Sequence, residues 1–141
     1  MLPNVRLASI CDADVLSRLN HEFNGGVKRP VPEIIKCLNS NNEVVAVATL
    51  RDEVVGFGCA QSLKSFCYNE AYGEITEMYV KESARRNGVA TALISFLESQ
   101  LYSRGVKTVK ILTGEDNRVA IKAYELSGYV KDDEVMLKKK L

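Results

Sequence analysis

The sequence predicts a single-domain α/β fold, in which helices cover both faces of a mixed β-sheet. Length and composition support one core, because 141 residues with 46% hydrophobic content suffice for one domain and leave no room for a second. Strand-like and helix-like stretches follow one another along the chain. No internal repeat or low-complexity segment interrupts this order. We therefore expect residues 1–141 to form one domain.

The N-terminal part predicts one strand and two helices. Residues 4–8 are a short strand candidate, and Asp12 is placed to cap a helix that extends to residue 23. The apolar positions of this helix share one face: Val15, Leu16 and Leu19. A loop rich in Gly and Pro follows at residues 24–30, and a second short helix at residues 32–38 carries Pro in its first turn.

The remaining elements alternate between the two periodicities. Residues 43–50 and 54–60 read as a β-hairpin, and a looser segment leads to a strand at residues 74–80. A helix is expected from Val89, whose apolar positions recur at helical spacing: Val89, Leu93, Phe96, Leu97 and Leu101. A strand at residues 107–112 and a second helical block from Asn117 come next. Two short strands at residues 129–131 and 135–138, around an acidic turn, complete the expected sheet.

Charge and hydropathy exclude two classes of partner. The formal net charge is +1, from 19 basic and 18 acidic residues, so the chain lacks the overall basic charge typical of nucleic-acid binding. The closing lysines 138–140 read as protection of an edge strand. No apolar stretch approaches the roughly 20 residues of a membrane span, and the N-terminus lacks the layout of a signal peptide. We expect a cytoplasmic protein that binds neither nucleic acid nor membrane.

The cysteines and the single histidine do not predict a metal site. Cys11, Cys37, Cys59 and Cys67 are too widely spaced for a C-x-x-C pair, and His21 is the only histidine. We interpret the thiols as structural and reduced. His21 lies near the end of the first predicted helix, where an exposed or capping role is the expected one.

A short basic turn joins the strand at 74–80 to the helix that starts at Val89. Gly88 falls at the start of the helix, where main-chain N–H groups have no helical partner and the helix dipole is positive. Phosphate oxygens bind at such a place, and Arg85 and Arg86 can add charge-assisted hydrogen bonds. The same residues also suit an ordinary helix start with solvated arginines. Both interpretations are open at this level.

Two blocks of sequence resemble the GNAT superfamily of N-acetyltransferases. Residues 85–90, Arg-Arg-Asn-Gly-Val-Ala, fit the R/Q-x-x-G-x-G/A signature, and the preceding Met78-Tyr79-Val80 resembles the family's strand ending. Residues 117–129 fit the later block N-x-x-A-x-x-x-Y-x-x-x-G-F/Y. The blocks occur in the family's order with a strand-like stretch between them. The resemblance covers the C-terminal half of the chain.

This resemblance implies a fold and a cofactor. In the family, the central sheet splays apart at a β-bulge in the strand that corresponds to residues 74–80, and acetyl-coenzyme A enters the gap. Main-chain groups of Met78 and Val80 pair with the pantetheine arm, and the loop from Arg85 to Thr91 wraps the pyrophosphate. The residues expected to bind the cofactor are Met78, Tyr79, Val80, Arg85, Arg86, Asn87, Gly88, Val89, Ala90, Thr91, Asn117 and Tyr124. Capping of a helix is an equally sound role for Asn117.

Acetyl transfer to an amine predicts further roles. An alkylammonium group is mostly protonated at neutral pH, so a base must remove a proton before the nitrogen attacks the thioester. Glu77, and after it Glu74, are the candidate bases, with neither as the third possibility. A main-chain N–H at the bulge, that of Met78, is the expected donor to the oxyanion. Tyr124 corresponds to the family's general acid, which protonates the departing thiolate.

The acceptor is the least determined part of the prediction. We favour a primary amine of a small molecule, because acidic residues suited to a polyamine or an aminoglycoside are present: Glu22, Glu70, Asp132, Asp133 and Glu134. Residues 21–25 and the two arginines also resemble small aminoglycoside N-acetyltransferases. The alternatives are a protein N-terminal or lysine acetyltransferase and a non-catalytic acyl-coenzyme A sensor. Either a monomer or a homodimer is compatible with the sequence.

Overall fold

A five-stranded mixed sheet forms the centre of the computed structural model, which describes residues 2–40 and 42–141. The strands are β1 (Asn4–Leu7), β2 (Val44–Leu50), β3 (Glu53–Leu63), β4 (Ala71–Val80) and β5 (Val106–Ile111). The helices are α1 (Ala13–Asn24), α2 (Val31–Leu38), α3 (Val89–Ser103) and α4 (Arg118–Leu126), with short 3-10 turns η1 (Ile10–Asp12) and η2 (Glu82–Ala84).

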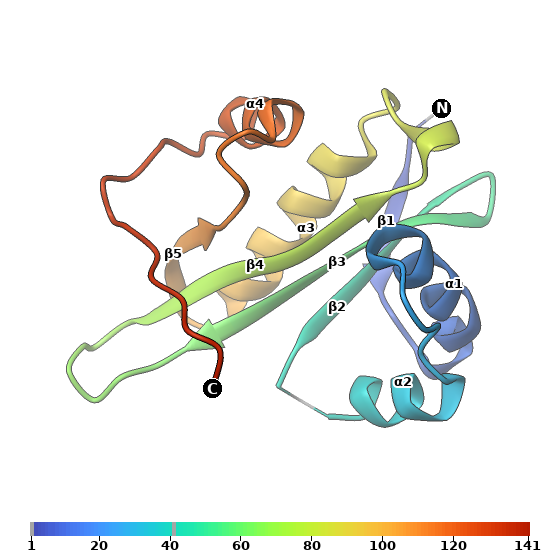
Figure 1. Ribbon diagram of the computed structural model, residues 1–141, viewed down its shortest axis with the longest axis horizontal. Coiled ribbons are helices and arrows are strands. Elements are labelled where there is room, and N and C mark those ends of the chain that lie inside the picture. The colour runs from blue at the N-terminus through green and yellow to red at the C-terminus, as the bar shows by residue number, and fades with distance from the viewer. Residues whose placement is uncertain (1, 41) are drawn as a thin grey trace.

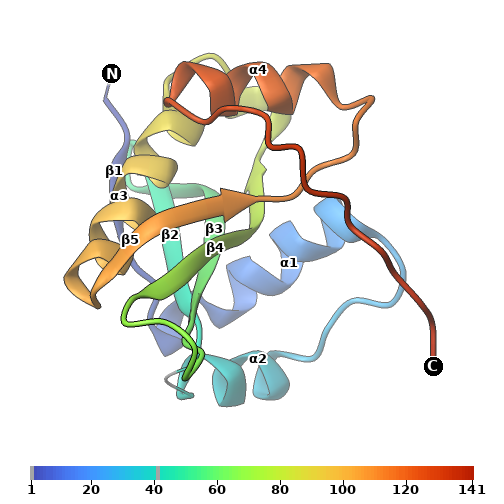
Figure 2. The same ribbon diagram turned by 90° about the vertical axis from the view of Figure 1, so that its left-hand side faces the viewer.

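The sheet has the strand order β1-β2-β3-β4-β5, antiparallel except for the parallel pair β4 and β5. Helices α1 and α2 lie on one face, and α3 lies on the other (Figures 1 and 2). Helix α4 lies beside the N-terminal half of α3 (Figure 1). These layers confirm the α/β fold that the sequence predicts. Among the described residues, no helix is both long and apolar enough to cross a membrane.

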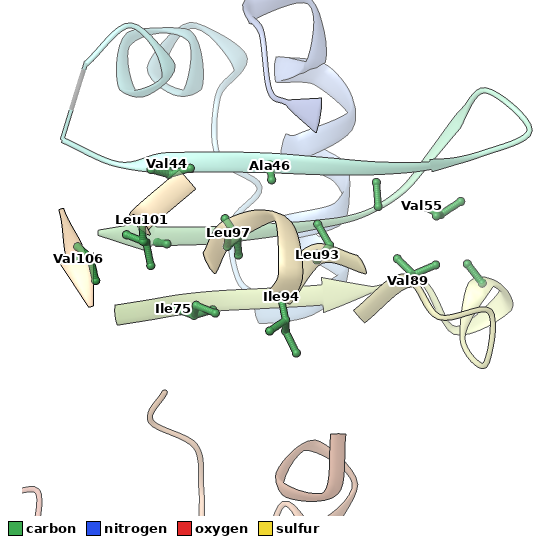
Figure 3. Close-up of a cluster of buried hydrophobic side chains, with 13 residues drawn as sticks. Val44, Ala46, Val55, Ile75, Val89, Leu93, Ile94, Leu97, Leu101 and Val106 are labelled. Atoms are coloured by element: carbon green, nitrogen blue, oxygen red, sulfur yellow. The ribbon is translucent and has the colours of Figure 1, made fainter. Parts of the chain in front are cut away.

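The larger core cluster lies between α3 and the sheet. Leu93, Leu97 and Leu101 are completely buried there, at the helical spacing that the sequence shows (Figure 3). Gly58 on β3 lets the helix come close, because a Cβ atom at that position would lie 2.9 Å from Leu97 Cδ1. The helix that begins at the basic loop is therefore tightly packed on the sheet.

A second cluster fixes α1 on the opposite face. Leu16 and Leu19 pack against Val47 and Phe57 of the sheet. The buried Ser17 hydroxyl donates to the main-chain oxygen of Arg29 at 2.6 Å, which ties the loop after α1 back to the helix. The end of α1 is thereby held near the C-terminal end of β4.

Strand β4 is bulged, and the sheet opens at the bulge. Cys59 of β3 faces Glu77, whereas the next residue Ala60 faces Ile75, so Thr76 is the extra residue on β4. The Thr76 hydroxyl donates to the main-chain oxygen of Cys59 at 3.3 Å. Pairing of β4 with β5 ends at Ile75, opposite Ile111, the last residue of β5. The splay expected from the family resemblance is confirmed at this position.

The two C-terminal strands expected from the sequence are not formed. Residues 129–131 and 135–138 have no regular structure, although α4 ends close to the open sheet edge. Val130, Val135 and Leu137 are 87%, 80% and 89% exposed. A strand propensity is expressed only when the strand is paired or buried, and this segment is neither. The prediction of strands here is wrong in the described structure.

Candidate active site

The basic loop forms a cradle of main-chain donors at the start of α3. Arg86 and Gly88 both have left-handed backbone angles, with φ of 66° and 75°. Ala92 N donates to Gly88 O at 3.0 Å as the first helical hydrogen bond. The N–H groups of Val89, Ala90 and Thr91 precede that bond and have no carbonyl available within the helix. This geometry suits an anion such as the phosphate that the sequence analysis considered.

Two side chains of the loop shape it from within. The Asn87 side-chain nitrogen donates to Ala84 O at 3.0 Å and to Arg85 O at 3.1 Å, so its amide braces the turn. Arg85 Nε donates to Val80 O at 3.0 Å, which holds this guanidinium group beside the end of β4. Arg86 is exposed. The loop thus combines a fixed main chain with two cationic side chains.

The end of β4 presents an edge that has no partner strand beyond Ile75, next to this cradle. Lys81 N donates to Val55 O at 2.8 Å, so this main-chain group points toward β3. Main-chain groups alternate in direction along a strand. Those of Met78 and Val80 therefore point away from β3, into the gap that opens between β4 and the end of β5. The extended arm of a ligand that lies in the gap can pair with them, as a neighbouring strand would.

Helix α4 borders the same region from the other side. Asn117 caps the helix, because its Oδ1 accepts from Ala120 N at 3.3 Å. Tyr124 is half-buried against the core, and its ring meets that of Tyr129 edge-on at 6.4 Å. Burial raises the pKa of the Tyr124 hydroxyl. A hydroxyl with a raised pKa stays protonated at neutral pH and can act as a proton donor.

A small cavity lies between α3 and α4. Its volume is about 160 Å³, and its walls include Thr91, Ser95, Glu98 and Ser127. The Ser127 hydroxyl is buried and, among the described residues, has no hydrogen-bond partner. Glu98 accepts a hydrogen bond from the Tyr129 hydroxyl at 2.8 Å, which ties the segment after α4 to α3. Thr91 belongs both to the main-chain donors at the start of α3 and to the wall of this cavity, so the cavity begins where those donors end.

The two predicted bases differ in their surroundings. Glu74 lies opposite Lys110 below the splay, and its carboxylate is 3.6 Å from the lysine ammonium group. Glu77 is exposed and flanks the bulge. The position of Glu77 at the opening of the sheet is therefore the better one for a base.

Glu43 is a candidate that the sequence reasoning missed. It directly precedes β2, on the same face as Glu77. Burial raises the pKa of its carboxyl; the Cys59 thiol lowers it by hydrogen bonding, and the negative charge of Glu77 raises it. The one available signal was a glutamate placed immediately before a buried strand. Cys59 itself is buried, which raises its thiol pKa and makes it unreactive.

The four cysteines and His21 do not join this site as ligands. All four thiols are free, with Cys59 buried and the other three exposed. His21 is exposed, and its main-chain oxygen accepts from Gly25 at the end of α1. Within residues 2–40 and 42–141, no three His, Cys, Asp or Glu side chains gather as a metal site would require.

Sequence comparison decides the family. Residues 14–129 match the model of the acetyltransferase (GNAT) family. The chain belongs to the GNAT family. An acetyltransferase of Yersinia pestis (strain Pestoides F) is 33% identical over 112 residues, which span 79% of this chain and 75% of that relative. As a GNAT member the protein is an acyltransferase, and the family predicted from residues 85–90 and 117–129 is confirmed.

Solved GNAT structures share the fold over the whole chain. Aminoglycoside N-acetyltransferase AAC(6')-Iy with the bisubstrate analogue CoA-S-monomethyl-acetylneamine aligns with a TM-score of 0.87 at 17% identity, covering 100% of this chain and 99% of that chain. The ribosomal-protein-alanine N-acetyltransferase of Brucella melitensis biovar Abortus 2308 aligns with a TM-score of 0.82 at 19% identity, covering 99% and 100%. Their names give different acceptors, so this GNAT fold alone does not select one.

Proposed function

We propose that the protein transfers the acetyl group of acetyl-coenzyme A to a primary amine of a small molecule, by direct attack in a ternary complex. One observation carries this proposal: the main-chain N–H donors of the loop at the start of α3 lie next to the part of β4 that has no partner strand. An anion cradle and an edge that can pair with an extended arm lie side by side, which fits a cofactor with a pyrophosphate and a pantetheine chain.

The cofactor-binding roles follow from this placement. Main-chain N–H groups of residues 86–91 receive the pyrophosphate, and Arg85 and Arg86 add positive charge. Met78 and Val80 pair with the pantetheine arm, and Tyr79 between them turns its side chain to the other face of the sheet. Asn87 contributes by bracing the loop, and Asn117 by starting the helix that carries Tyr124.

The proton of the acceptor ammonium passes to a carboxylate at the bulge. We assign Glu77 as the base, acting directly or through water, with Glu74 held in its ion pair with Lys110. Burial, and after it the negative charge of Glu77, raise the pKa of the Glu43 carboxyl, so Glu43 is a second group near Glu77 that can take up a proton. The amine nitrogen then attacks the thioester carbonyl, and the Met78 N–H stabilises the oxyanion.

Collapse of the tetrahedral intermediate releases the coenzyme A thiolate. Tyr124 donates its proton to that sulfur, because burial keeps the hydroxyl protonated at neutral pH. No step of this scheme requires a metal ion. A base on β4 and an acid on α4 therefore act from opposite sides of the open sheet.

A thiol-release assay tests the proposal. Wild-type protein and acetyl-coenzyme A are incubated with alkylamines, polyamines, aminoglycosides and peptides with free N-termini or lysines. Turnover that is confined to small amines supports the proposal, whereas turnover confined to peptides assigns a protein acetyltransferase instead. Coenzyme A binding, seen as a thermal shift, without turnover on any acceptor would indicate a sensor. No thermal shift at high coenzyme A concentration would overturn the cofactor assignment.

A further inference from the structure

A second pocket lies on the face of the sheet opposite α3, between the end of α1 and the end of β4. Its volume is about 470 Å³, and its walls are formed by Glu22, Tyr79, Lys81, Glu82 and Ser83. The loop donors that suit a phosphate belong to α3, on the other face (Figure 2). This pocket is therefore separate from the cradle for the donor.

One aromatic ring, that of Tyr79, lines the pocket, and other aromatic rings hold it in place. The Tyr79 ring stacks on Phe23 of α1 with centroids 5.3 Å apart and planes 25° apart, and Phe57 meets Phe23 edge-on at 6.3 Å. The Tyr79 hydroxyl donates to Glu22 Oε2 at 3.1 Å. This hydrogen bond ties the end of α1 to β4 and fixes the carboxylate of Glu22. A fixed carboxylate beside aromatic rings is an arrangement that binds organic cations.

The charges around the pocket leave one negative charge in excess. Glu22, Glu82 and Arg85 all act on the Tyr79 hydroxyl, and desolvation and Glu22 raise its pKa so that it remains a hydrogen-bond donor. Lys81 reaches Glu53 at 3.3 Å, and this pair is neutral. The two remaining carboxylates are those of Glu22 and Glu82. The positive charge of Arg85, whose Nε donates to Val80 O, offsets one of them. A single ammonium group would balance the other.

The pocket is in line with the proposed base. Glu77 and Tyr79 are two residues apart on β4, so their side chains point to the same face and are displaced by about 7 Å along the strand. The pocket extends beyond Tyr79 to residues 81–83. A chain of four or more methylene groups lets one nitrogen lie beside Glu77 while the other enters the pocket.

We propose that this pocket binds the second ammonium group of a linear diamine or polyamine whose first amine is acetylated beside Glu77. The inference rests on the proposed amine acetylation and adds the class of acceptor. Glu22 and Glu82 supply the charge, and the Tyr79 ring, held by its stacking on Phe23, contacts the methylene chain. Glu22 is then a specificity residue, which discriminates diamines from monoamines without touching the reacting nitrogen.

The test compares butane-1,4-diamine with butylamine, which carries the same carbon chain and lacks the second charge. Wild-type protein is expected to have a lower KM for the diamine. In Glu22→Gln the KM for the diamine rises about tenfold, as expected for loss of a charge-assisted hydrogen bond, while kcat and both constants for butylamine stay unchanged. Tyr79→Phe, which releases Glu22 but keeps the stacked ring, shows a smaller rise with the same pattern.

Glu125→Gln on the exposed side of α4 is the matched control, and it should leave both amines unaffected. The inference is overturned if Glu22→Gln changes the constants of both amines equally, or if wild-type protein uses both amines with the same KM. In either case acetylation of butylamine still supports the proposed function. If wild-type protein acetylates neither amine nor any other small amine, the proposed function fails and the inference fails with it.

Discussion

Tyr124 combines a half-buried position with a hydroxyl whose pKa is raised by burial. We expect Tyr124→Phe to lower kcat by about 100-fold, because a general acid typically contributes this much, and to leave the affinity for acetyl-coenzyme A nearly unchanged. Steady-state kinetics and calorimetric titration measure the two quantities. Tyr68→Phe, on the exposed loop after β3, is the control. Unchanged turnover in Tyr124→Phe removes this hydroxyl from the mechanism.

At the residue scale, sequence reasoning predicts main-chain roles better than side-chain roles. The position of Gly88 predicted where the helix begins, because a helix start depends on local backbone geometry. Asn87 was expected to bind the cofactor through the loop, and the sequence did not predict that its side chain braces the turn. Glu43 was missed, and the role of Glu22 was left undecided. Their neighbours, Glu77 and Tyr79, both lie on β4, far from them in the sequence. Such neighbours are visible only after folding.

The loop between β4 and α3 depends on the left-handed conformation of Gly88. A Cβ atom there would meet nothing within 4 Å, so substitution strains the backbone without a clash. We expect Gly88→Val to raise the dissociation constant of acetyl-coenzyme A at least tenfold, whichever amine is offered, because the cradle is distorted and partly covered.

Gly105→Ala separates strain from binding in this experiment. Gly105 has φ of 87° and also has free space around its Cα, but it lies at the far end of α3. Its substitution should cost about 1 kcal/mol of folding stability and leave cofactor affinity unchanged. A binding defect in Gly88→Val that appears with one amine alone would contradict the assignment of this loop to the donor.

Two glycines of β3, Gly56 and Gly58, lie so close to their neighbours that a side chain at either position should lower stability. A Cβ atom at Gly56 would lie 2.8 Å from the main-chain oxygen of Tyr79, whereas one at Gly58 would lie 2.9 Å from a methyl group of Leu97. Main chain moves less easily than a side chain. We expect Gly56→Ala to lower the free energy of unfolding by about 3 kcal/mol and Gly58→Ala by about 1 kcal/mol.

Urea unfolding measures these changes, with Gly114→Ala as the control. Gly114 has neither a left-handed backbone nor a neighbour within 4 Å, so its substitution should change stability by less than about 0.5 kcal/mol. Equal effects at Gly56 and Gly58 would show that β3 and β4 can shift apart at little cost.

A helix or strand was predicted correctly where its local sequence pattern is matched by a neighbouring element that buries its apolar face. The helix from Val89 and the hairpin of β2 and β3 follow from periodicity and become buried as expected. Residues 135–138 carry the same kind of strand pattern, yet Val135 and Leu137 remain exposed. The difference lies in the partner strand, which the local sequence does not contain. The bulge at Thr76 was expected only through the family resemblance, since an extra residue leaves no periodicity of its own.

For the whole molecule, an ion pair joins the first strand to the first helix. Asp12 is buried, and its two carboxylate oxygens accept from Arg6 at 2.7 and 2.9 Å. The pair with Arg6 and the Ser9 N–H hold the pKa of Asp12 below its ordinary value. A lowered pKa gives stability that is present above the unfolded-state value, about 3.9, and is lost as pH falls through the folded-state pKa.

Asp12→Asn is therefore expected to destabilise the protein by about 2 kcal/mol at pH 7, with the gap to wild type closing below about pH 4. Urea midpoints over a pH series provide the measurement. Asp14→Asn is the control on the same helix, because Asp14 is exposed and its distance to Arg18 is 3.8 Å. A gap that stays constant down to low pH would mean that charge on Asp12 does not stabilise the fold.

The exposed C-terminal segment affects how the purified protein behaves at high concentration. Val130, Val135, Met136 and Leu137 present apolar surface to water. A formal net charge of +1 at pH 7 provides almost no electrostatic repulsion between copies. Colloidal stability at neutral pH is therefore set by this segment, and solubility should improve as the pH is moved away from neutrality or when a lysine replaces Val135, which removes apolar surface and raises the net charge.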